Sequence, residues 1–484
     1  MYLRGRLVAW VCSLGLVACG GAAEEAGDPL VAGGDVGLDG VEGADGAGDA
    51  PLTDAAEDVP EPTPDTGPTK PVWDVNAEKR KTCLFAAGSR TTETIGPAVP
   101  HGDALPFEHV VVLMLENRSF DHYFSELPSY GVTDVDVAGA DDSNPDPSTG
   151  KPVKRFHETR YCVVDTAHNW GPVHLQYDDG LMDGFVMTSN PGGARAMGYY
   201  DQTDIPYYYW LSKTFAISDR HFCSLLGPTW PNRFYFYGAT SWGRTHTPDT
   251  PPLGKPKITD QLQGIGKSWK IYRNGTVSFA LVFGPSYAGT NFTNFGEDVK
   301  NDKLPSLAII DPNFTGGENG AQDDEHPPAN IQKGQKFVKR VVDTLASNPA
   351  VWKKTVLLVT YDEHGGFYDH VAPPEACEPD GDRPPDYKFD RLGIRVPLFA
   401  ISPWTKPGYV SHTVTDLSSL TRFIQNRWDL PALTRRDANA WPMLDMFDFS
   451  KMSFEKAPAG APSADPTAAG LDWCRENSPG TGLP

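Results

Sequence analysis

Two apolar segments of this chain each run directly into polar side chains that could do chemistry. The sequence Val-Val-Val-Leu-Met-Leu precedes Glu116 and Asn117. The sequence Val-Leu-Leu-Val-Thr-Tyr precedes Asp362 and Glu363. Carboxylate and amide oxygens are ligands of hard divalent cations, and carboxylates also act as general acids or bases. The two clusters therefore predict a catalytic site.

The adjacent carboxylates of Asp362 and Glu363 give the stronger of these two signals. Two neighbouring acidic groups at the end of a buried segment repel each other unless a cation lies between them. This pattern favours metal ligation. For Glu116 and Asn117 the plain alternative is that they form a turn.

Both apolar segments are typical of strands that are buried on both faces of a parallel sheet. In such sheets ligands bind beyond the carboxyl ends of the strands, where the two polar clusters lie. An amphipathic pattern at residues 333–346 predicts a helix just before the second segment. The order of helix and strand predicts an α/β fold with a mostly parallel central sheet.

Other segments predict the remaining elements of this fold. A smaller mixed region is expected at about residues 245–325. The further elements that we expect are a helix and a short strand within 205–217, strands at 268–272, 307–310 and 396–401, and a helix that Asp416 caps.

Thr229 follows a Gly-Pro turn and stands at the start of a predicted helix, with Pro231 in the first turn. The N-terminus of a helix offers free N–H groups and the positive end of the dipole, which together bind anions. A hydroxyl at this place becomes a nucleophile toward a bound phosphate if a cation lowers its pKa. The plain alternative is that Thr229 only caps the helix.

The N-terminal residues 1–18 predict a signal peptide. Arg4 and Arg6 precede an apolar stretch that is too short to span a bilayer. The sequence Leu-Val-Ala before Cys19 resembles a bacterial lipobox, which implies cleavage before Cys19 and a lipid anchor on it. We therefore expect an exported lipoprotein of the bacterial cell envelope, at the outer membrane or the cell surface. An ordinary secretory signal is the alternative.

Residues 19–71 predict a disordered, extended tether, since they hold thirteen acidic residues against Lys70 and little apolar surface. Residues 72–455 are then the expected catalytic domain, and 456–484 a weakly structured tail rich in Ala, Pro and Gly. The net charge of the whole chain is −21, of which the tether carries more than half. An acidic folded part argues against nucleic acid as a partner.

Five cysteines remain when Cys12 of the signal and Cys19 are set aside. An oxidising exterior permits disulfides, and an odd number leaves at least one free thiol. We expect one or two disulfides, whose pairing the spacing does not give.

Three segments, residues 107–124, 227–233 and 361–370, resemble in order the signatures of the bacterial phosphoesterase family, which contains phospholipases C and acid phosphatase A. The resemblance implies a three-layer α/β/α sandwich of the alkaline-phosphatase type. It also implies hydrolysis of phosphate esters assisted by one or two divalent metal ions of unknown identity.

The resemblance also implies roles for particular residues. Thr229 is the expected nucleophile, which would form a phosphothreonine intermediate. His168 and His326 would bind phosphate oxygens or protonate the leaving group, and Asn117 would also stabilise the oxyanion. The metal ligands that it implies are Glu116, Asn117, Asp362, Glu363 and Thr229. Further expected substrate contacts are Arg233, His370 and Ser224.

The substrate that we expect is a phosphoester, above all the head group of a phospholipid, as for a phospholipase C. The alternative within enzymes is a phosphomonoesterase of the acid phosphatase type. A more remote alternative is a catalytically silent lipoprotein that binds surfaces. The sequence leaves the oligomeric state open.

Overall fold

The computed structural model describes residues 73–316, 320–381, 384 and 386–476. The predicted signal peptide, Cys19 and the predicted tether lie outside these residues. Among the described residues, no helix combines the length and the apolar character needed to cross a bilayer.

A mostly parallel sheet of eight strands forms the centre of the described part of the chain. Strands β11, β1, β10, β8 and β9 run parallel in that order, and β12 is antiparallel to both of its neighbours, β11 and β6. In spatial order the strands are β13 (Val410–Ser411), β6 (Ala216–Ser218), β12 (Leu398–Ile401), β11 (Thr355–Tyr361), β1 (His109–Leu115), β10 (Leu307–Asp311), β8 (Trp269–Arg273) and β9 (Thr290–Asn291).

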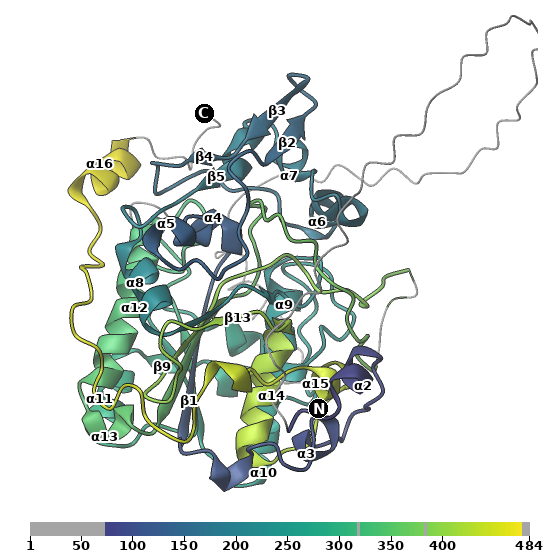
Figure 1. Ribbon diagram of the computed structural model, residues 1–484, viewed down its shortest axis with the longest axis vertical. Coiled ribbons are helices and arrows are strands. Elements are labelled where there is room, and N and C mark those ends of the chain that lie inside the picture. The colour runs from purple at the N-terminus through teal and green to yellow at the C-terminus, as the bar shows by residue number, and fades with distance from the viewer. Residues whose placement is uncertain (1–72, 317–319, 382–383, 385, 477–484) are drawn as a thin grey trace, which may run out of the picture. The chain divides into compact units, whose positions relative to one another are not determined.

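Helices cover both faces of this sheet (Figure 1). Helices α8 (Pro206–Thr214) and α12 (Ile331–Ala346) lie on one face, and α9 (Thr229–Gly238) and α14 (Leu417–Trp428) lie on the other. Successive side chains of a strand point to opposite faces. Accordingly, Val111, Leu113 and Leu115 of β1 join one apolar core, and Val110, Val112 and Met114 join the other. The expected three-layer α/β/α sandwich is confirmed.

Shorter elements surround the three layers. The helices among them are α2 (Ala77–Lys81), α3 (Thr91–Thr94), α4 (Phe120–Phe124), α5 (Leu127–Tyr130), α6 (Trp170–Tyr177), α7 (Phe185–Thr188), α10 (Ile258–Gly264), α11 (Thr293–Lys300), α13 (Pro349–Trp352), α15 (Arg435–Asn439) and α16 (Ala468–Glu476). The short strands pair as β2 (Ser143–Asp146) with β3 (Lys151–Lys154), β4 (Phe156–His157) with β5 (Gly198–Tyr199), and β7 (His221–Phe222) with β14 (Thr415–Asp416).

Two regions differ from the sequence expectation. Residues 245–325 contribute β8, β9 and β10 to the central sheet, because β10 pairs in parallel with β1. The tail, expected to be weakly structured, contains the helix α16, and a disulfide between Cys162 and Cys474 ties this helix to the rest of the domain.

The disulfide expectation is confirmed among the described residues. A second disulfide joins Cys83 to Cys377, and Cys223 is a buried free thiol. The two bridges link parts of the chain that are 294 and 312 residues apart in sequence. The two disulfides thus tie the first and last described parts of the chain covalently to the rest of the domain.

Candidate active site

The two predicted clusters lie next to each other because β1 and β11 are neighbouring parallel strands. Leu115, the last residue of β1, is in register with Tyr361, the last residue of β11. The backbone N–H of Asp362 donates to the carbonyl of Leu115 at 3.2 Å, and the N–H of Arg118 donates to the carbonyl of Glu363 at 3.0 Å. The carboxyl ends of both strands therefore lie side by side at one end of the sheet, which is where ligands bind in such sheets.

The guanidinium of Arg233, a residue of α9, lies between carboxylates of the two clusters. Its Nε donates to Oδ2 of Asp362 at 2.8 Å, and its Nη2 donates to Oε1 of Glu116 at 3.0 Å. Burial lowers the pKa of Arg233, but the charges of Asp362 and Glu116 outweigh this effect and raise it. Arg233, expected to be a substrate contact, is thus a buried counter-cation that holds two carboxylates together.

Thr229 is the first residue of α9 and follows the N-cap residue Pro228, one position later than a cap. Its hydroxyl donates to Oε1 of Glu363 at 3.4 Å. Thr229 is 8% exposed. A helix of ten residues begins at this point, so its free N–H groups and dipole lie beside the hydroxyl.

Glu363 is completely buried and lies among several active-site groups. Its Oε1 is 3.9 Å from Nε2 of His168, and its Oε2 accepts a hydrogen bond from the N–H of Gly365 at 3.2 Å. Burial raises the pKa of the Glu363 carboxyl, and the charge of His168 opposes this increase. A buried carboxyl with a raised pKa is a good acceptor for a proton.

Asn117 stands at the end of β1 in the left-handed region, with φ of 63°. A non-glycine residue in this conformation is strained, and such strain is common at functional sites. Its Nδ2 lies 3.4 Å from Nε2 of His168, whereas its buried Oδ1 has no hydrogen-bond partner. An unpaired buried oxygen calls for an explanation, such as an ion that it binds.

His168 and His326 come together from distant loops, with 5.5 Å between their ring centroids. Nδ1 of His168 lies 2.7 Å from the carbonyl of Thr166 and donates to it, which turns Nε2 toward Glu363 and Asn117. Burial lowers the pKa of His168, but the nearby charges, above all Glu363, raise it overall.

Asp165 completes this pair of histidines. One ligand atom each of Asp165, His168 and His326 lies within 4.8 Å of the other two. Burial lowers the pKa of His326, but charges, Asp165 first among them, raise it overall. The sequence analysis did not identify Asp165, whose only signal is its position three residues before His168 in a polar loop.

Gln176 and His364 form a buried link that the sequence analysis also missed. Nε2 of Gln176 donates to the carbonyl of Ala167 at 2.6 Å and to Oγ1 of Thr188 at 2.9 Å. Its Oε1 must then face Nε2 of His364, which donates to it at 2.8 Å. Gln176 thereby connects the loop of His168 with the loop of Glu363. Gln176 belongs to no pattern that sequence alone associates with a site, whereas His364 lies within the signature at residues 361–370.

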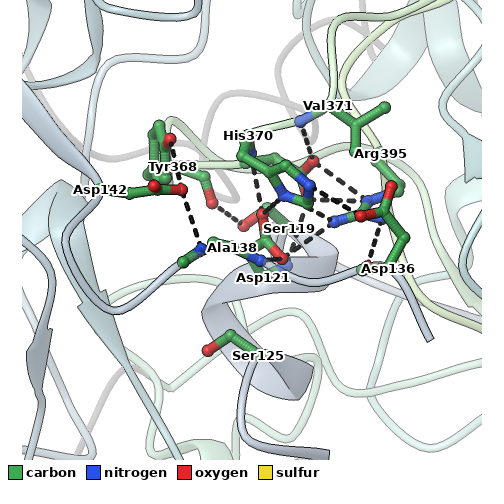
Figure 2. A network of polar contacts seen from close by, with 12 residues as sticks. Ser119, Asp121, Ser125, Asp136, Ala138, Asp142, Tyr368, His370, Val371 and Arg395 are labelled. Atoms are coloured by element: carbon green, nitrogen blue, oxygen red, sulfur yellow. Dashed lines mark hydrogen bonds and ion pairs between the residues drawn. The ribbon is translucent and has the colours of Figure 1, made fainter. Parts of the chain in front are cut away.

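His370 and Ser224, expected to contact substrate, have other partners in the structure. His370 lies 2.6 Å from Oδ2 of Asp121 and 3.1 Å from Oδ1 of Asp136, in a network that Arg395 completes (Figure 2). Ser224 donates to Oδ2 of Asp416 at 2.8 Å. The described contacts of both side chains are therefore with structural carboxylates.

The donor set at the strand ends fits a hard divalent cation. It offers buried carboxylate oxygens together with the unpaired Oδ1 of Asn117, and no sulfur. Among the described residues, the groups of at least three acidic or histidine side chains whose ligand atoms lie within 4.8 Å of one another are Asp165, His168 and His326; Asp121, Asp369 and His370; and His157, Asp201 and Asp204. The first adjoins the site, and Arg395 already neutralises the second. Glu116, Asp362 and Glu363 do not form such a group, and the guanidinium of Arg233 lies between the carboxylates of Glu116 and Asp362.

A helix N-terminus that presents a hydroxyl to buried carboxylates, with two histidines nearby, is the arrangement of a hydrolase that acts on an anionic ester. The model of the Phosphoesterase family matches residues 107–431. The chain therefore belongs to the phosphoesterase family, and it is an ester hydrolase of that family.

Named relatives are similar over most of the chain. Phospholipase C B of Mycobacterium tuberculosis is 32% identical over 448 residues, which cover 76% of this chain and 82% of that protein. Non-specific phospholipase C1 of Arabidopsis thaliana is 34% identical over 399 residues, 74% of each chain. Among solved structures, the lipoteichoic acid synthase LtaP of Listeria monocytogenes is 10% identical with a TM-score of 0.39, covering 75% of this chain and 81% of that one.

Proposed function

We propose that this protein is a metal-dependent phosphoesterase of the phospholipase C type, which removes phosphorylated head groups from phospholipids through a phosphothreonine intermediate. The observation that carries the proposal is the hydrogen bond of 3.4 Å from the hydroxyl of Thr229 to Glu363, at the N-terminus of α9. The names of the relatives in Mycobacterium and Arabidopsis support the substrate class.

In the proposed first step, the N-terminus of α9 binds the phosphate of the substrate. The oxygen of Thr229 attacks phosphorus, its proton passes to Glu363, and the bond from phosphorus to the leaving oxygen breaks. His168 or His326 gives a proton to that oxygen, since nearby carboxylates raise the pKa of both histidines. Water then attacks phosphorus and gives a proton to the same histidine, the bond from phosphorus to the oxygen of Thr229 breaks, and that oxygen recovers its proton from Glu363 as the phosphorylated head group leaves.

Asn117 has two roles in this proposal. Its Nδ2 lies on the same side as Nε2 of His168, 3.4 Å away, and can donate to a phosphoryl oxygen. Its Oδ1, which has no hydrogen-bond partner, would join Glu116, Asp362, Glu363 and Thr229 in holding a divalent cation. When bound, the cation supplies positive charge that stabilises the phosphoryl oxygens and lowers the pKa of the attacking hydroxyl.

The experiment that tests the proposed function compares three substrates with the purified protein. These are phosphatidylcholine, p-nitrophenyl phosphorylcholine and p-nitrophenyl phosphate. The proposal predicts diacylglycerol from the first and faster turnover of the choline diester than of the monoester. Faster turnover of the monoester would instead establish the phosphomonoesterase alternative.

Variants of two hydroxyl residues sharpen this test. Thr229→Ala should lower turnover by at least 10³-fold without a change in thermal stability, because it removes the nucleophile. Ser224→Ala is the matched control, since this hydroxyl bonds to Asp416, and it should keep activity within a few fold. Loss of activity in Ser224→Ala alone would transfer the role of nucleophile to Ser224.

We also propose that the protein is exported and anchored to the bacterial cell envelope through a lipid on Cys19. The support is the lipobox-like sequence that ends at this cysteine. Labelling of cells with radioactive palmitate should mark the wild-type protein but not Cys19→Ser. Equal labelling of both proteins would refute the anchor.

A further inference from the structure

Three large apolar side chains are exposed within thirteen residues of α6, α7 and the turn between them. Leu175 is 54% exposed, Leu181 is 70% exposed and Met187 is 42% exposed. In the described part of the chain, Leu181 is the most exposed of the large apolar side chains. These three residues are called the apolar tip below. Single exposed apolar residues are ordinary, whereas a concentration of them indicates an interaction site.

Helices α6 and α7, which carry Leu175 and Met187, are packed side by side. A Cβ atom on Gly184 would lie 2.0 Å from the carbonyl oxygen of Leu175, so only glycine permits this contact. Thr188 of α7 accepts the hydrogen bond from Gln176 of α6. Figure 1 shows both helices beyond the carboxyl end of β1.

The backbone of the connecting turn holds Leu181 outside. Asp178, Asp179 and Met182 have positive φ angles of 39°, 49° and 55°, which are unfavourable for residues with a side chain. Met182 is only 4% exposed and packs in a small apolar core, whereas Leu181 beside it points to solvent. The fold therefore keeps a strained turn that exposes a leucine where burial would be expected.

The inner face of α6 fixes the apolar tip relative to the catalytic groups. Gln176 is completely buried and bonds to Ala167 and His364, which are the neighbours of His168 and Glu363 in sequence. A binding partner on the outer face of α6 would therefore lie next to the candidate active site.

We propose that the apolar tip docks on the surface of a zwitterionic phospholipid bilayer and thereby brings lipid phosphates to Thr229. This inference rests on the proposed function. Apolar side chains that enter the head-group boundary bind by burial of their surface. The exposed Asp178 and Asp179 lie just before Leu181 in sequence, and acidic groups disfavour anionic lipids but tolerate the choline groups at the surface of a zwitterionic bilayer.

The test uses the full chain with Cys19→Ser, which removes the proposed lipid anchor, and vesicles of phosphatidylcholine. The protein should co-sediment with these vesicles, and admixture of phosphatidylglycerol should weaken binding. Leu181→Ser combined with Met187→Ser should weaken binding at least tenfold. Ile265→Ser is the matched control, because Ile265 is 48% exposed just after α10 and just before β8. Since β8 runs parallel to β10 and β1, this residue lies near the amino ends of these strands, at the end of the sheet opposite to the candidate active site. This control should bind like the parent protein.

Turnover of soluble p-nitrophenyl phosphorylcholine separates this inference from the proposed function. The double variant should keep this turnover and lose hydrolysis of vesicle lipids. A parent protein that turns over no soluble substrate refutes the proposed function, while its vesicle binding still decides the docking. Failure of the parent to bind phosphatidylcholine, equal binding of the double variant, or stronger binding to phosphatidylglycerol would each overturn the docking. A dimer of the parent protein in solution that the double variant no longer forms would also overturn the docking, because the apolar tip would then bind a second copy of this chain.

Discussion

The hydroxyl oxygen of Thr229 lies 3.4 Å from Oε1 of Glu363, although 134 residues separate them in sequence. Two features of the fold produce this contact. The parallel pairing of β1 with β11 places Glu363 at the carboxyl end of the sheet, and Arg233 binds α9 to Asp362 at the same place. The helix N-terminus therefore faces the carboxylates, and the proposed chemistry depends on this orientation.

Replacement of Arg233 tests whether the guanidinium holds the site together. Arg233→Met leaves the buried carboxylates of Glu116 and Asp362 without their cation, and loss of one partner of a buried ion pair costs about 3–5 kcal/mol. We expect a clear decrease in the urea midpoint. Arg475→Met is the control, because this arginine is exposed and its effect should stay within about 0.5 kcal/mol. Equal midpoints of Arg233→Met and wild type would contradict this role.

A substitution at Gly365 tests whether turnover depends on the position of Asn117. Gly365 has φ of 66°, and a Cβ atom there would lie 2.6 Å from both Cβ and the carbonyl oxygen of Asn117. Gly365→Ala should therefore displace Asn117 and lower turnover at least tenfold. Gly150→Ala is a matched control, since Gly150 has φ of 68° but no atom within 4 Å of the added Cβ. Turnover of Gly365→Ala that equals that of Gly150→Ala would contradict the prediction that the contact with Asn117 matters.

The network of His370 predicts a dependence of stability on alkaline pH. Burial lowers the pKa of His370, but its hydrogen bonds to Asp121 and Asp136 outweigh this and raise it to about 10, above its ordinary value of 6.5. A raised pKa in the folded state means that the stabilising charge is fully present below pH 6.5. It is lost as the pH rises from 6.5 through about 10.

Thermal unfolding of wild type and His370→Gln across this pH range measures the effect. The melting temperature of wild type should fall more steeply with rising pH than that of the variant, since the variant has no group to deprotonate in this network. Arg395 and Asp369 remain in both proteins and cancel in the comparison. Parallel curves would show that the charge of His370 contributes nothing.

The two disulfides predict sensitivity of the fold to reduction. Each closes a loop of about 300 residues and so restricts the unfolded chain. Such a restriction typically stabilises the folded state by about 2–4 kcal/mol. Cys83→Ser with Cys377→Ser should lower the melting temperature. Cys223→Ser should have a much smaller effect, because this thiol is free. A wild-type protein whose melting temperature is insensitive to a reductant would contradict this prediction.

Much of the fold could be predicted from local patterns. The strands β1 and β11 were predicted because their apolar residues form an unbroken run without a helical period. The helix α12 was predicted because its apolar residues lie on one side. The place of β8, β9 and β10 in the central sheet could not be predicted, since strand pairing depends on contacts between distant segments.

The candidate site divides in the same way. Glu116, Asp362 and Thr229 could be proposed as site residues from the sequence because each follows or begins a recognisable element. Asp165 and Gln176 were missed because their importance lies only in what they contact in space. Arg233 was expected to contact substrate; its contacts with the carboxylates of Asp362 and Glu116 could not be predicted, because they depend on how α9 packs against the strand ends.

The identity of the residue that becomes phosphorylated tests the central claim most directly. Wild-type protein is mixed with a phosphodiester substrate that carries ³²P, quenched in acid within milliseconds, and digested for peptide mapping. The proposed function predicts label on Thr229 and none in Thr229→Ala. Label on Ser224 or another residue, or turnover with no labelled protein at any time, would contradict it.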